Sequence, residues 1–116
     1  MINEIFTTLP YAKTERKRFN DTTLAFCNLS DFSQEQQTML MQYAQSLNVN
    51  LRDVFFVVTR EDDFGAKATI VNTYTRAELR AILSKHRYEF ANICTREAFG
   101  YIGYMSSTTI FNVNAK

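Results

Sequence analysis

Glycine, proline and cysteine are scarce in this sequence. Its 116 residues include three glycines, one proline, two cysteines and no tryptophan. This composition excludes collagen-like and low-complexity chains, and two distant cysteines exclude a disulfide-stapled mini-protein. No apolar run approaches the roughly 18–20 residues of a membrane-spanning helix, since the longest candidate, residues 54–58, has the length of a strand. What remains is a chain of the size of one folded domain, residues 1–116.

The N-terminus and the cysteines indicate a cytoplasmic protein. Residues 1–6 include an acidic side chain and lack the basic start of a secretory signal. Without such a signal, Cys27 and Cys94 are most simply interpreted as reduced thiols in a cytosol. We therefore expect a cytoplasmic protein with inert buried cysteines and no membrane contact.

Charge is nearly balanced overall but unevenly distributed. Thirteen basic and twelve acidic residues leave a net charge of +1, which is not the basic excess typical of a nucleic-acid-binding protein. Residues 1–18 carry a net +2, residues 19–63 a net −5 and residues 64–96 a net +4. Such segregated charge can steer a protein partner toward its binding site.

Hydrophobic periodicity and capping residues predict the order of the secondary structure. Residues 24–29 form a short apolar run typical of a buried strand, and residues 33–48 combine a capping box with apolar residues at helical spacing. Residues 53–59 and 67–74 predict a hairpin joined by a polar loop. A second capping box at residue 75 begins a helix that we expect to reach about residue 93, and the segment that follows predicts one or two strands.

This β-α-β-β-α-β order predicts an α+β fold of the ferredoxin-like type. In that arrangement two helices cover one face of an antiparallel sheet. The expected core spans residues 22–116, with the C-terminal segment adding a strand. Residues 1–21 are expected to form a helical and basic N-terminal extension, since an apolar helical face there ends at Pro10.

Residues 24–30, followed by the helix start, resemble the first strand and first helix of an RNA-recognition-motif domain. Asn28-Leu29 matches the end of the family's first-strand motif, and Lys67 and Tyr74 match the ends of its third-strand motif. The resemblance covers about residues 22–93. It implies a fold of this type and binding of single-stranded RNA or DNA by base stacking on the central strands.

The sequence departs from that family at the stacking positions themselves. These positions fall on Ala25, Thr69 and Val71, none of which is aromatic. A missing aromatic ring costs about 1–3 kcal/mol of stacking free energy per base. The resemblance therefore implies the fold more strongly than it implies nucleic-acid binding.

Charged side chains supply the candidate protein-binding surfaces. On the second predicted helix, Arg76, Arg80 and Arg87 fall within about 40° of one another around the helix axis. Such a row can grip phosphates or a carboxylate-rich partner. An acidic patch in the predicted hairpin loop forms a second candidate surface, which would meet a basic partner: Glu61, Asp62 and Asp63.

A second set of residues would serve the alternative function of binding single-stranded RNA or DNA. A basic arm, which we expect to be mobile, comprises Lys13, Arg16, Lys17 and Arg18. Phe99 and Tyr101 would share one face of a strand and form a small stacking pair.

The sequence does not predict a catalytic, metal or cofactor site. His86 and Cys94 lie more than two helical turns apart, and no zinc-ligand spacing or glycine-rich phosphate loop occurs. We expect a non-catalytic protein-interaction domain that modulates or inhibits a larger protein or ribonucleoprotein complex. Phages and mobile elements encode antagonists of this kind. Binding to a second copy of the same chain, as a homodimer, is one version of this protein-interaction function. The alternative is a single-stranded RNA- or DNA-binding module.

Overall fold

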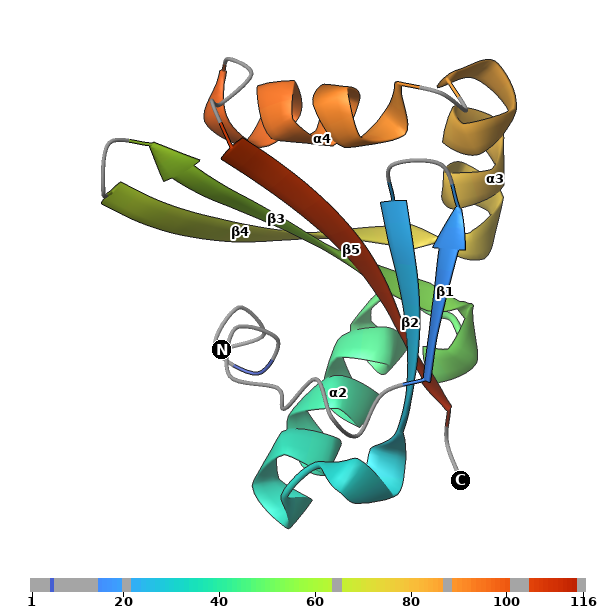
Figure 1. Ribbon diagram of the computed structural model, residues 1–116. Helices are drawn as coiled ribbons and strands as arrows, with labels where there is room; N and C mark the ends of the chain where they lie inside the picture. The colour runs from blue at the N-terminus through green and yellow to red at the C-terminus, as the bar shows by residue number, and fades with distance from the viewer. Residues whose placement is uncertain are drawn as a thin grey trace.

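The protein is a mixed sheet with helices packed against it, as the computed structural model shows (Figure 1). The structure describes residue 5 and residues 15–19, 22–63, 66–86, 89–100 and 105–114. The strands within this part are β1 (Glu15–Phe19), β2 (Thr22–Asn28), β3 (Val54–Asp63), β4 (Ala66–Thr75) and β5 (Met105–Asn114). Its helices are α2 (Gln34–Ser46), α3 (Arg76–His86) and α4 (Phe90–Phe99), with short 3-10 turns η2 (Leu29–Asp31) and η3 (Leu51–Asp53).

The strand order is β1-β2-β5-β3-β4. β5 pairs in parallel with β2 and antiparallel with β3, while the outer pairs β1–β2 and β3–β4 are antiparallel. The predicted α+β class is confirmed, but the predicted ferredoxin-like, antiparallel sheet is wrong. The C-terminal segment forms one strand, which lies at the centre because Ile110, Phe111 and Val113 bury apolar side chains on both sides of it.

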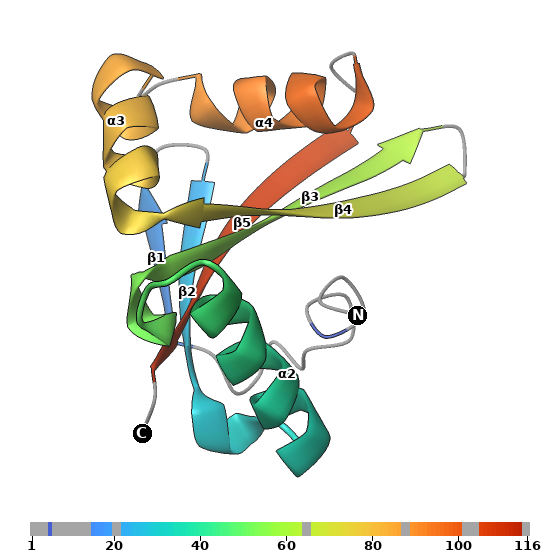
Figure 2. The same cartoon turned by 180° about the vertical axis from the view of Figure 1, so that it is seen from behind.

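Helices cover both faces of the sheet, whereas the sequence analysis placed two helices on one face. In both views α2 lies on one side, and α3 and α4 lie on the other (Figures 1 and 2). The sequence of β3 explains why both faces are covered, because its apolar residues form a continuous run and do not alternate with polar residues. Val54, Phe56 and Val58 belong to the core beside α2, and Phe55 and Val57 belong to the core beside α3 and α4. Such runs are typical of strands buried on both faces.

Both predicted capping boxes are confirmed. The Ser33 N–H donates to Gln36 Oε1 at 3.1 Å, and the Gln36 N–H donates to Ser33 Oγ at 3.2 Å. At the start of α3, the Thr75 N–H donates to Glu78 Oε1 at 3.1 Å, and the Glu78 N–H donates to Thr75 Oγ1 at 3.3 Å. These reciprocal bonds satisfy backbone donors that a helix leaves unpaired at its first turn.

Two predicted boundaries are wrong. Residues 60–63 belong to β3, because they pair with β4 in register, and do not form a polar loop. The helix predicted to end near residue 93 is instead two helices, and α4 continues to Phe99. Gly100 ends α4 with a left-handed φ of 80°, and its N–H donates to the Arg96 carbonyl at 2.7 Å.

The N-terminal extension contributes an edge strand to the sheet. β1 pairs with β2 at five positions, so Arg16, Lys17 and Arg18 belong to a strand and not to the mobile arm predicted from the sequence. Lys13 lies outside the described residues. Ile5 is helical, as predicted, and packs in the core beside α2 with 3 % exposure.

Candidate functional site

Helix α2 is anchored on the sheet by one apolar side. Leu40 and Ala44 are buried. Tyr43 packs against Phe56 with 6.1 Å between the ring centroids, and its hydroxyl is hydrogen-bonded to Thr73 on β4. These contacts set the rotation of the helix, so the residues on its opposite side face solvent.

The solvent-facing side of α2 carries a line of uncharged residues. Gln34, Thr38, Met41 and Gln45 follow one another at spacings of four, three and four residues, which places them along one side of a helix. All four are exposed, and Met41 is 44 % exposed. We call these four residues the α2 seam. Its spacing is the one with which helices pack against each other in coiled coils.

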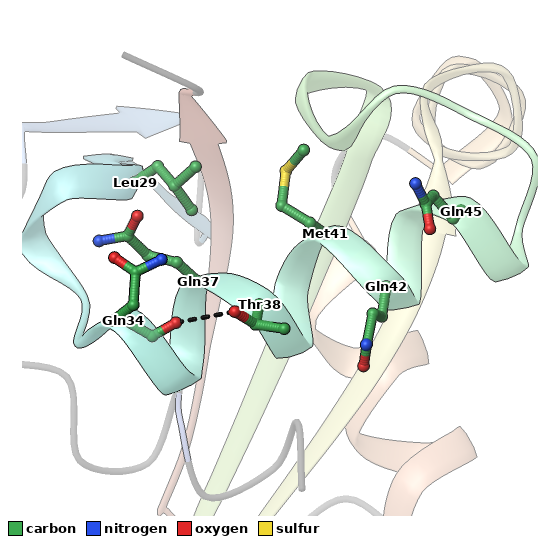
Figure 3. Close-up of a pocket in the computed structure, with 7 residues that line it drawn as sticks. All are labelled: Leu29, Gln34, Gln37, Thr38, Met41, Gln42 and Gln45. Carbon is green, nitrogen blue, oxygen red and sulfur yellow. Dashed lines mark hydrogen bonds between the residues drawn. The ribbon is translucent and has the colours of Figure 1, made fainter.

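A groove of about 270 Å³ follows the α2 seam (Figure 3). Leu29 from η2 lies at one end of the labelled set and Gln45 lies near the other. Two side chains are held by hydrogen bonds: Gln37 Nε2 donates to the Phe32 carbonyl at 2.9 Å, and Thr38 Oγ1 donates to the Gln34 carbonyl at 3.0 Å. The lining residues are Leu29, Gln34, Gln37, Thr38, Met41, Gln42 and Gln45.

The chemistry of this groove is polar but uncharged. None of its lining residues is ionisable, and Glu35 is the one charged residue of α2. A glutamine amide donates and accepts hydrogen bonds, and the flexible thioether of Met41 adapts to different apolar surfaces. The groove can therefore bind a surface with uncharged polar groups and an apolar side chain, but it offers no charge to a phosphate or a carboxylate.

A different polar cluster lies buried on the sheet face beside α4. Thr59 and Thr108 oppose each other across β3 and β5, and Glu61 lies two residues further along β3. Their exposures are 0 %, 2 % and 4 %. Within the described part of the chain, both threonine Oγ1 atoms and Glu61 Oε1 have no hydrogen-bond partner. The described residues hold no group of three or more His, Cys, Asp or Glu residues that could bind a metal ion.

Burial of Glu61 changes the interpretation of the predicted acidic patch. We expected this carboxylate in an exposed loop, but it lies on β3, on the sheet face beside α4, and is 4 % exposed. Asp62 and Asp63 follow it in the same strand, and their side chains lie outside the described part of the structure. Glu61 is therefore unavailable to a partner in this conformation.

The predicted arginine row is divided between structural and exposed positions. Arg76 Nε donates to Asp53 Oδ1 at 3.0 Å, and Arg76 Nη2 donates to the Arg52 carbonyl at 3.0 Å. Its guanidinium also lies 5.0 Å from the centroid of the Phe55 ring. Arg76 thus attaches the start of α3 to η3. Arg80 is exposed on α3, and Arg87 lies outside the described residues.

The predicted stacking pair does not form on a strand. Phe99 is the last residue of α4 and is partly buried, and Tyr101 lies outside the described residues. The resemblance to the RNA-recognition motif places bases on an open sheet face, but helices pack on both faces here (Figures 1 and 2).

Both cysteines are buried free thiols, as predicted. Cys27 Sγ donates to the Asn112 carbonyl at 3.7 Å. Burial, together with the nearby Asp31 charge, raises the pKa of Cys27 to about 12. This thiol is therefore protonated at neutral pH, and a protonated buried thiol is a poor nucleophile.

The residues of the α2 seam were not among the sites predicted from the sequence. The available signal was the outer side of residues 33–48, which carries five glutamines where helices usually carry charges. Because glutamine is a strong helix former, its abundance was interpreted as support for a helix and not as a sign of a binding surface.

No protein-family model, curated protein or solved structure matches this chain. None of the helices in the described residues is long and apolar enough to cross a membrane.

Proposed function

We propose that this protein is a small non-catalytic interaction domain that binds a larger protein or ribonucleoprotein complex and modulates it. The observation that supports the proposal is Met41, exposed at the centre of an uncharged groove on α2. Met41 and Leu47 are the exposed large apolar side chains among the described residues. Methionine is enriched at the contact surfaces of protein complexes.

The partner surface that fits the α2 seam is a helix with uncharged contacting side chains. The seam residues repeat at the spacing that lets two helices pack side by side. Glutamine and threonine at these positions form hydrogen bonds with either donors or acceptors of the partner, and Met41 packs against one apolar side chain. A charged partner helix would lose solvation without gaining an ion pair, so the seam disfavours it.

Photo-crosslinking inside the natural host cell tests this proposal. A photoreactive amino acid is placed at Thr38 or Gln45 of the seam, and at Glu35 or Ser46 as controls. All four positions are exposed on α2 or at its end, so folding is equally preserved. We expect a discrete protein adduct from each of the two seam positions and little adduct from the controls. Adding Met41→Lys to a seam variant should abolish its adduct.

Two results would count against this function. Adducts of equal yield from all four positions, or no adduct at all, would remove the seam as the docking surface. Binding of labelled single-stranded RNA or DNA with affinity that falls as salt rises would instead favour the nucleic-acid alternative, because the slope reports neutralised phosphates.

A further inference from the structure

The two edges of the sheet differ in how they are protected against pairing. β1 has five residues, and four of them are charged. Short, charged edge strands are a common protection against pairing with another chain. β4, at the opposite edge, has ten residues, of which Lys67 is the one charged residue.

β4 has the composition and exposure of a strand that can accept a neighbour. It contains no proline or glycine, and β-branched residues fill half of its positions. Residues 69–75 are each partly exposed, whereas residues 54–59 of the neighbouring β3 are all buried. β4 pairs with β3 along its whole length. Within the described residues, no backbone hydrogen bond joins β4 to another strand on its outer side.

Among the described residues, the position of β4 leaves this edge accessible. Figure 2 shows β4 along the near side of the sheet, with the end of the β3–β4 hairpin reaching beyond the helices. α2 lies on one face and α4 on the other, so they flank the strand without extending the sheet past it (Figures 1 and 2). A backbone edge of this kind binds another strand by main-chain hydrogen bonds.

We propose that β4 pairs with β4 of a second copy of this chain, antiparallel across a two-fold axis. A pairing centred on Val71 places Val71 opposite itself and Thr69 opposite Thr73. It places Lys67 opposite Thr75, so the two lysines do not face each other. Thr–Thr pairs are favourable across strands and β-branched side chains pack well against neighbours on a pleated sheet, whereas like charges directly opposite are unfavourable.

The same register keeps the two faces of the sheet continuous. Val71 and Thr73 lie on the side of the sheet that packs against α2, through the α2-side core and the Tyr43 hydroxyl. In the proposed dimer they oppose residues of that same side in the second copy, because antiparallel pairing preserves alternation. Two five-stranded sheets then form one sheet with the β4 edges closed.

This dimer is independent of the α2 seam, because seam and edge belong to different elements. Sedimentation equilibrium and a charge swap test it. Thr69→Glu/Thr73→Glu places like charges on two symmetric rungs, and Thr69→Glu/Thr73→Lys places opposite charges on the same rungs. Both variants lose the Tyr43–Thr73 hydrogen bond, so they are matched for folding, which circular dichroism checks. We expect the wild-type protein to be a dimer, the Glu/Glu variant a monomer and the Glu/Lys variant a dimer.

A disulfide test keeps the proposal falsifiable if both charge variants unfold. Cα atoms of directly opposed residues in antiparallel strands lie about 4.5–5.5 Å apart, within the range of about 4.4–6.8 Å that a disulfide spans. Val71→Cys alone should therefore form a disulfide dimer under mild oxidation. Thr69→Cys should do so only when mixed with Thr73→Cys. A monomeric wild-type protein, a dimer that both charge variants retain, or no disulfide from Val71→Cys would overturn the proposal.

Discussion

Replacing Thr59 by valine should make the protein more stable. The Thr59 hydroxyl is fully buried and lacks a hydrogen-bond partner among the described residues. A buried polar group without a partner costs about 1–3 kcal/mol, and valine has nearly the same shape and an equally good strand propensity. We therefore expect Thr59→Val to raise the free energy of unfolding by about 1–3 kcal/mol.

Thr95→Val is a matched control for this substitution. Thr95 is also 0 % exposed, but its Oγ1 donates to the Ala91 carbonyl at 2.8 Å. Valine at this position removes a hydrogen bond that contributes about 0.5–1.5 kcal/mol. The control should therefore leave stability unchanged or lower it. Thr59 and Thr95 are equally buried and differ in whether the hydroxyl has a hydrogen-bond partner. A difference in stability between the two variants therefore reports the effect of the missing partner of Thr59.

Urea unfolding followed by circular dichroism measures both variants. The slope of unfolding free energy against urea should stay that of the wild-type protein, so the shift in midpoint reports stability alone. Thr59→Val/Thr108→Val extends the test, because these residues oppose each other in the sheet. Gains that add indicate two separate unpaired hydroxyls, while strong non-additivity indicates a shared group such as a trapped water. A loss of about 1 kcal/mol or more in Thr59→Val would refute the reasoning.

Three further predictions concern other contacts. Arg76→Ala should lower the unfolding free energy by about 1–2 kcal/mol, since it loses the half-exposed ion pair with Asp53 and a hydrogen bond to the Arg52 carbonyl. Arg80→Ala, at an exposed position, should change the unfolding free energy by less than about 0.5 kcal/mol. Equal urea midpoints for the two variants would contradict this prediction. Ser33→Ala should cost about 1 kcal/mol by removing the α2 cap, measured by thermal melting. Because burial raises the pKa of Cys27 from 9.0 to about 12, the unfolded chain ionises first, so stability should fall as pH rises from about 9 to 12. Cys27→Ala should flatten that fall in urea midpoints measured across this range.

Much of the local structure could be predicted from the sequence because it depends on neighbouring residues. The capping boxes at Ser33 and Thr75 start helices where their side chains reach the first-turn N–H groups. The hairpin, the first buried strand and the α+β class were predicted from periodicity for the same reason. The split between α3 and α4 was missed because apolar helical spacing continues through residue 93.

The candidate site was the least predictable part. Arg76 and Glu61 were predicted as site residues because they are charged. In the structure, Arg76 forms an ion pair with Asp53 and Glu61 is buried. Neither outcome follows from local spacing, because Asp53 is distant from Arg76 in the chain and α4, which packs over the sheet face of Glu61, is distant from Glu61. Met41 is one of several apolar residues in its helix, and only packing shows that it faces away from the core.

By itself, the sequence determined the order of the elements from β2 to β5, except for the division between α3 and α4, together with the N-terminal caps of α2 and α3 and the scarcity of charge along α2 and β4. The tertiary structure alone decided that β5 enters between β2 and β3, that helices occupy both faces and that β4 lies at an edge. The physical reason is that periodicity tells which side chains share a face of a strand. Periodicity does not tell which strands are neighbours in the sheet. The choice of neighbours depends on the total apolar area that segments distant in the sequence bury against each other.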